Sequence, residues 1–154
     1  MLVAIDTSVL VAWVVEKHVF HTRAEPWFAA MEDGKLDAVV CAHAPAELYS
    51  VLTKLPEGLS PVAAQLAVRN IANRARVVPL TSGMYDEAID HCAKRGLKSG
   101  SVFDSLHVVA AERRGARLLL TFNPADFTRL VAGGEPRIVV PPEPPSVDPA
   151  LSEL

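Results

Sequence analysis

The feature that most constrains the fold is the alternation of short apolar runs with longer stretches that carry helix start and stop signals. The run LVAI at 2–5, which ends at Asp6, is typical of a buried strand. The expected strands are 2–5, 37–42, 76–80 and 116–122, with 137–140 as a further candidate. The expected helices are 7–15, 21–34, 44–55, 60–75, 81–96 and 101–115. This order predicts an α/β fold of three layers, in which a central parallel sheet is flanked by helices.

The length of 154 residues predicts one domain, because it suffices for a single core. We place that domain at 1–140 and expect the proline-rich tail at 141–154 to be extended, disordered or laid on the surface. The first apolar run meets Asp6 too early for a secretory signal, and the run 9–15 is too short to cross a bilayer. We therefore expect a cytoplasmic protein with no membrane partner.

Several common catalytic motifs are absent from the sequence. It has no GxGxxG after a strand, no GxxxxGK[ST], no GxSxG and no HExxH. Its two cysteines, Cys41 and Cys92, have neither CxxC spacing nor a zinc-type histidine cluster, so we expect buried thiols. Dinucleotide binding, P-loop chemistry, serine hydrolysis and zinc proteolysis are therefore disfavoured.

Polar side chains are instead placed where strands end and helices begin. Asp6 follows the first strand, Asn123 and Asp126 follow the strand 116–122, and Glu47 and Asp104 lie near helix starts. In open parallel sheets, sites gather at the carboxyl ends of the strands, so we expect these oxygens to converge. Converging carboxylates need a cation, and Mg²⁺ prefers oxygen ligands. The pattern therefore favours metal-assisted hydrolysis of a phosphodiester.

Each of these residues also has a purely structural interpretation. Asp6 can cap the next helix, Asp104 can stabilise a helix dipole, and Glu47 can be an exposed first-turn residue. Asp126 can cap a short helix at Phe127. His107, one turn after Asp104, can approach the site or pack on its helix, and packing is the favoured interpretation.

The net charge of −3 is not typical of a nucleic-acid partner, because phosphate binding rests largely on Lys and Arg. A bound divalent ion would reverse the local sign at an acidic site. A face of clustered basic residues would have the same effect, although solvated helix ends are the favoured interpretation of these residues. The candidates are Arg69, Arg74, Arg76, Arg113, Arg114 and Arg117.

The segments AIDTSVL, PAELYSVL and SVFDSLHVVAAERRGARLLLTFNPADF, with their spacing, resemble the PIN-domain ribonucleases, in particular the VapC-like toxins of type II toxin–antitoxin pairs. The resemblance extends to about Val140. It implies a Rossmann-like PIN fold and an endoribonuclease that depends on Mg²⁺ or Mn²⁺ and acts through an activated water. The alternatives are a PIN nuclease of RNA processing or decay without an antitoxin, or a non-catalytic PIN-like binding domain.

The resemblance also assigns roles to residues. It implies that Asp6, Glu47 and Asp104 are the acids that bind the metal. Ser8, two residues after Asp6, is expected to support the site, as is Thr121.

The fourth position of the family pattern is Asn123, where an acid is common. An amide oxygen can still meet an ion or its water. The change removes one charge, however, which weakens the case for a second tightly bound metal. Asp126, one turn later, is the candidate replacement.

The resemblance further implies two protein partners besides RNA: a second copy in a homodimer, and a VapB-like antitoxin laid over the active-site groove. Trp13, Trp27 and Phe28 are candidates for its apolar contacts. They are equally candidates for the core.

Overall fold

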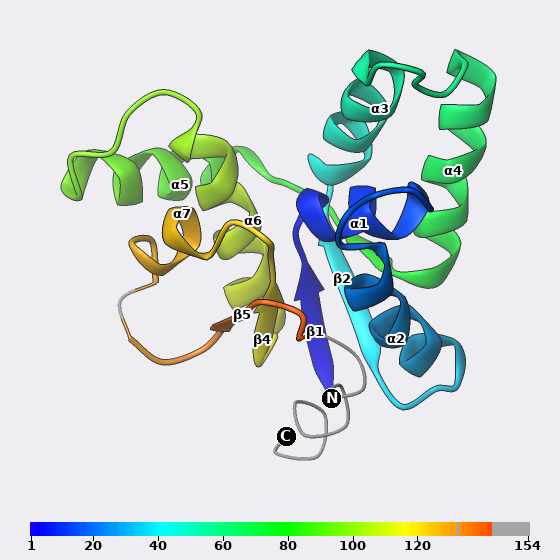
Figure 1. The fold of residues 1–154 in the computed structure, drawn as a ribbon. Coiled ribbons are helices and arrows are strands. Elements are labelled where there is room, and N and C mark those ends of the chain that lie inside the picture. The colour runs from blue at the N-terminus through cyan, green and yellow to red at the C-terminus, as the bar shows by residue number, and fades with distance from the viewer. Residues whose placement is uncertain (132, 143–154) are drawn as a thin grey trace.

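The computed structural model describes residues 1–131 and 133–142, so most of the tail expected at 141–154 lies outside the described residues. Helices and strands alternate along the chain as the sequence predicted (Figure 1). The strands are β1 (Leu2–Ile5), β2 (Asp37–Cys41), β3 (Arg76–Val78), β4 (Leu118–Leu120) and β5 (Arg137–Val139). The helices are α1 (Thr7–Val14), α2 (His21–Glu32), α3 (Ala44–Lys54), α4 (Pro61–Arg74), α5 (Ser82–Lys94), α6 (Ser101–Arg114) and α7 (Pro124–Thr128).

The five strands form one parallel sheet in the order β3-β2-β1-β4-β5. The candidate strand at 137–140 is confirmed as β5, which pairs with β4. The chain builds outward from β1 to β3 on one side and then crosses to β4 and β5 on the other. The order therefore reverses between β1 and β4, and a crevice forms at such a point in open α/β sheets.

Helices cover both faces of the sheet, which confirms the three-layer prediction. Val3 and Ile5 of β1 pack in a cluster with residues of α1, α2, α3 and α4, whereas Ala4 faces a second cluster with α5, α6 and α7. Figure 1 shows these two groups of helices on opposite sides of β1 and β2. Successive strand side chains point to opposite faces, so strands buried on both sides must be apolar throughout, as LVAI is.

The aromatic residues considered for partner binding belong mainly to the core. Trp27 and Phe28 of α2 are each 1% exposed. Trp13 is partly exposed, and its ring stacks on Phe28 with centroids 4.2 Å apart. The core interpretation is therefore confirmed for the two α2 residues.

Several expected boundaries were wrong by a few residues. β4 covers Leu118–Leu120 rather than 116–122, because Ala116 N still bonds to Ala111 O at the end of α6. The chain then turns into α7, which the sequence raised only as an alternative for Asp126. None of the helices in 1–131 and 133–142 is long and apolar enough to cross a membrane, and the cytoplasmic location stays a prediction.

Three of the basic residues considered for a phosphate-binding face pair with acids. Arg74 contacts Glu32 at 2.9 Å, Arg113 contacts Glu87 at 2.7 Å, and Arg117 contacts Glu135 at 3.4 Å. These side chains are partly or largely exposed, so for these three residues the structure favours solvated, acid-paired side chains over a phosphate-binding face.

Candidate active site

One pocket at the carboxyl ends of β1 and β4 collects most of the polar residues expected from the sequence. Asp6, Glu47, Asp104 and Asn123 all line it, around a volume of about 370 Å³. Asp6 joins β1 to α1, Glu47 and Asp104 lie in the first turns of α3 and α6, and Asn123 precedes α7. The other lining residues are Thr7, Ser8, Val11, His18, Phe20, Val51 and Phe122. The structure thus brings the four residues together, and their roles as ligands stay a prediction.

Hydrogen bonds fix one carboxylate oxygen of Asp6, Oδ2. Ser8 donates to it from its backbone N at 3.4 Å and from its hydroxyl at 2.6 Å, and the Thr121 hydroxyl donates at 2.9 Å. Asp6 is therefore the N-cap of α1 and a wall of the pocket at once. Because the donors gather on Oδ2, Oδ1 remains available to a ligand, with His107 Nε2 3.9 Å away.

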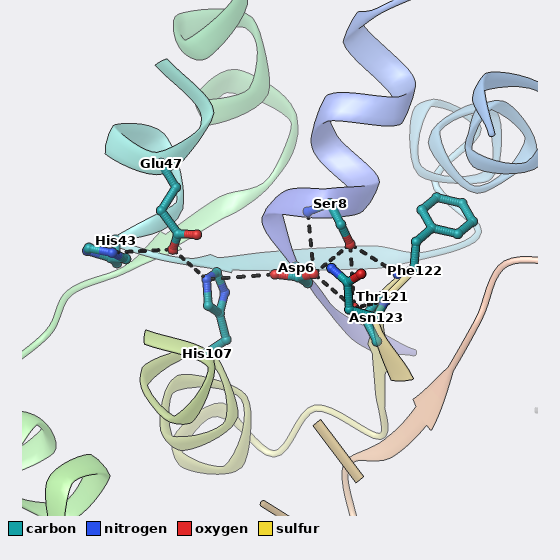
Figure 2. Close-up of polar contacts among 8 residues, drawn as sticks. All are labelled: Asp6, Ser8, His43, Glu47, His107, Thr121, Phe122 and Asn123. Carbon is teal, nitrogen blue, oxygen red and sulfur yellow. Dashed lines mark hydrogen bonds and ion pairs between the residues drawn. The ribbon is translucent and has the colours of Figure 1, made fainter. Parts of the chain in front are cut away.

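The loop after β4 connects Asp6 to the rest of the pocket (Figure 2). Phe122 donates its backbone N–H to Ser8 Oγ at 3.0 Å, and Asn123 donates its backbone N–H to Thr121 Oγ1 at 2.9 Å. Ser8 and Thr121 are also 3.4 Å apart through their hydroxyl oxygens. The two residues expected to support the site therefore join the β1 end to the β4 end.

Glu47 lies between two histidines (Figure 2). His107 Nε2 is 2.9 Å from Glu47 Oε1, and His43 Nε2 is 3.4 Å from the same oxygen. The His107 side chain is only 3% exposed. His107 is buried, as the favoured packing interpretation predicted, and it also reaches Glu47 of the site, as the alternative allowed.

A weak signal for His107 existed in the sequence. It follows Asp104 by three residues in α6, and residues three apart share a helix face. His43 has the same relation to Glu47 at a spacing of four. Its ring also stacks on Phe103, with centroids 4.9 Å apart and planes 4° from parallel.

The charged groups of the pocket shift one another's pKa. Burial alone would raise the pKa of Glu47, but the hydrogen bond and charge of His107, together with His43 and Thr7, lower it. Burial likewise opposes the charge of His107, yet Glu47 and then Asp6 raise the pKa of this histidine. Burial, followed by the charges of Asp6 and Asp126, raises the pKa of Asp104 to about 6. The two shifts favour the charged forms of Glu47 and His107, which are 2.9 Å apart, while the charge of Asp104 is poorly compensated.

Asp126 fits neither sequence interpretation fully. It lies in the first turn of α7, whose N-cap is Asn123, so it is not the cap. Its carboxylate contacts Arg129 at 3.3 Å, and its side chain is 52% exposed. It does not line the pocket, although its charge helps to raise the pKa of Asp104.

The donor set fits a hard divalent cation. Among the residues that the structure describes, no three His, Cys, Asp or Glu side chains form a ready-made metal site. Carboxylate and amide oxygens nevertheless line one pocket, and such oxygens are the ligands that Mg²⁺ takes. Burial, followed by the negative charges of Asp6 and Asp126, raises the pKa of Asp104, so nothing in the pocket fully compensates the charge of this carboxylate. A divalent ion would supply the missing positive charge.

Comparison with known proteins gives the same family as the sequence motifs. A profile of the PIN domain family matches residues 3–132. The chain is 35% identical over 116 residues to Ribonuclease VapC27 of Mycobacterium tuberculosis (strain ATCC 25618 / H37Rv), covering 75% of this chain and 80% of that protein. It is 34% identical over 120 residues to Ribonuclease VapC40 of the same species (strain CDC 1551 / Oshkosh), covering 77% of this chain and 84% of that protein.

Solved structures resemble the fold. The crystal structure of Mycobacterium tuberculosis VapC20, a Sarcin-Ricin loop cleaving toxin, superposes with a TM-score of 0.69 at 19% identity, over 87% of this chain and 97% of that one. VapBC2 from Rickettsia felis, bound to a DNA fragment from its promoter, gives a TM-score of 0.64 at 16% identity, over 91% of this chain and 98% of that one. At these identities the likeness concerns the fold alone.

Proposed function

The chain belongs to the PIN domain family, and from this premise we propose that it is an endoribonuclease of the VapC type, the toxin of a toxin–antitoxin pair. Its curated relatives at 34% and 35% identity bear the name ribonuclease. A fold alone is compatible with many functions. The observation that carries the proposal is therefore the pocket itself, where Asp6, Glu47, Asp104 and Asn123 meet at the reversal of strand order.

The cofactor in this proposal is Mg²⁺ or Mn²⁺. Asp6 and Asp104 would hold it, and Glu47 would complete the ligand set directly or through water. When bound, such an ion neutralises phosphate charge, lowers the pKa of a water and stabilises the leaving oxygen. Asn123 orients a water through its amide. Asp126 acts on Asp104 only through its charge, because its carboxylate contacts Arg129 and does not line the pocket.

Other residues act by positioning these ligands. Ser8 and Thr121 hold Oδ2 of Asp6, so the carboxylate keeps one orientation. His107 donates to Glu47 from a buried position and thereby fixes that carboxylate. Partners of this kind commonly decide how well metal ligands work.

Two protein partners belong to the proposal, and the surface offers apolar sites for both. Tyr85 and Ile89 of α5 and Phe103 of α6 are large and exposed, which suits a homodimer contact. A separate pocket of about 420 Å³ between the end of α1 and the α3–α4 connection includes Leu55 and Leu59, and it suits an apolar segment of a VapB-like antitoxin.

A cleavage assay tests the function. Structured RNA is incubated with the protein in Mg²⁺ or Mn²⁺, with and without EDTA, beside the variants Asp6→Asn and Asp104→Asn. We expect metal-dependent cuts that leave a 5′-phosphate and a 3′-hydroxyl, and loss of cleavage in both variants. Cleavage that survives EDTA or both substitutions, or that leaves a cyclic phosphate, would contradict the mechanism. Growth arrest on expression, relieved by a co-expressed small upstream gene, separates a toxin from an RNA-processing nuclease.

A further inference from the structure

The acidic pocket continues into a group of aromatic side chains that the proposed hydrolysis does not use. His18, Phe20 and Phe122, here called the aromatic wall, line the same pocket as Asp6 and Asn123. They come from the α1–α2 connection and from the loop after β4, which are far apart in the sequence. Water activation requires carboxylates, so large rings at the same site call for a separate explanation.

Two rings of the aromatic wall are stacked, and the third, His18, is tilted by 51° against Phe20. The rings of Phe20 and Phe122 have centroids 4.5 Å apart and planes 21° from parallel, and the His18 ring lies 5.8 Å from Phe20. The guanidinium of Arg23 covers both phenylalanines, 5.0 and 5.3 Å from their centroids. Its Nε donates to Pro141 O at 2.8 Å. The rings are thus held in place before any ligand binds.

The aromatic wall is also fixed relative to the acids. The backbone N–H of Phe122 donates to Ser8 Oγ, and the same hydroxyl donates to Asp6 Oδ2. In Figure 2 the Phe122 ring lies on the side of Asp6 opposite Glu47 and His107. A polymer whose phosphate reached the acids would therefore bring a neighbouring group to the rings.

We propose that the aromatic wall is a base-stacking subsite, which takes one unpaired nucleobase beside the phosphodiester that is cut. This inference rests on the proposed ribonuclease function and adds to it the place where a base beside the cut would bind. Unpaired bases offer their faces to aromatic rings, whereas bases inside a duplex do not. Stacking of this kind tolerates every base, because each has a π-face.

The competing explanation is packing alone. Phe20 and Phe122 are partly buried and touch the core cluster beneath α1 and α2. A packing role predicts lower stability for a smaller side chain and no effect that depends on the RNA. A base-stacking role predicts an effect that disappears when the base itself is missing.

The test pairs a ring change with a base change. After the cut in a single-stranded oligoribonucleotide has been mapped, wild type, Phe122→Leu and Phe122→Tyr are assayed on that RNA and on versions with an abasic site at either flanking position. We expect Phe122→Leu to lower kcat/KM roughly tenfold on the intact RNA, and one abasic site to lower the wild-type value similarly. The leucine variant should be insensitive to that site, and Phe122→Tyr should keep most of the wild-type activity. Tyr49→Leu, at an exposed aromatic that does not line the pocket, is the matched control.

Equal sensitivity of wild type and Phe122→Leu to every abasic site would overturn the subsite while leaving the nuclease intact. If Phe122→Leu does not fold, Phe20→Leu takes its place. If wild type cuts no RNA, binding is measured instead, by the quenching of 2-aminopurine fluorescence in the oligoribonucleotide. Quenching that depends on Phe122 would then support the subsite although the nuclease had failed, and quenching that ignores Phe122 would overturn it.

Discussion

Asp104→Asn should stabilise the metal-free protein, because the ionised carboxylate of Asp104 destabilises the folded state in this pocket. The pKa of Asp104 rises from 3.8 to about 6, and a pKa unit corresponds to about 1.4 kcal/mol, so its charge costs at most roughly 3 kcal/mol. The residue is only partly buried, and solvent screening reduces this to roughly 1–2 kcal/mol. An amide has nearly the same shape and carries no charge. We therefore expect the free energy of unfolding at about pH 8 in EDTA to increase by that amount.

The sign follows from the direction of the pKa shift. A carboxyl whose folded pKa is raised destabilises the fold above that pKa and has no such effect below its unfolded value. The advantage of Asp104→Asn should thus shrink as the pH falls through about 6 and vanish near 4. Mn²⁺ should reverse the order, because it stabilises only a protein that binds it.

Urea unfolding monitored by circular dichroism measures these differences. Asp86→Asn, an exposed carboxyl on α5, is the matched control and should change little in any condition. The reasoning would be refuted if Asp104→Asn were less stable than wild type in EDTA at about pH 8. Equal stabilisation of wild type and Asp104→Asn by Mn²⁺ would also refute it.

Three further outcomes follow from the same pocket. Titration calorimetry should show Mn²⁺ affinity falling about tenfold between pH 7.5 and 5, because protons compete for Asp104; a flat profile would count against this. His107→Leu removes the donor to Glu47 and should weaken Mn²⁺ binding roughly tenfold, whereas His107→Gln, which keeps a donor, should lose less; equal losses would assign His107 to packing alone. Asn123→Asp adds a carboxylate and should bind a second ion that wild type binds weakly. Tight binding of two ions by wild type would instead show that the amide at this position does not weaken binding of the second ion.

The sequence predicted the layers and the meeting of the acids well, because both depend on local pattern plus one topological rule. LVAI has to be buried on both faces, and residues at the carboxyl ends of neighbouring parallel strands have to meet. Asp6, Glu47 and Asp104 could therefore be placed together before any coordinates were known.

What the sequence could not supply were contacts between side chains that are distant along the chain. The bond from Thr121 to Asp6 spans 115 positions, and the bond from His107 to Glu47 spans 60. Neither has a periodic signature. The contact of Asp126 with Arg129 is local, at a spacing of three, but it depends on the short helix α7, which the sequence raised only as an alternative.

The most direct test of a divalent-ion site in this pocket is anomalous diffraction from crystals grown with Mn²⁺. We predict a peak between Asp6 and Asp104, with carboxylate oxygens of both at roughly 2.1 Å and Glu47 in its shell or one water away. A pocket without a peak, in crystals of a protein that cuts RNA in the same Mn²⁺ buffer, would contradict the assignment.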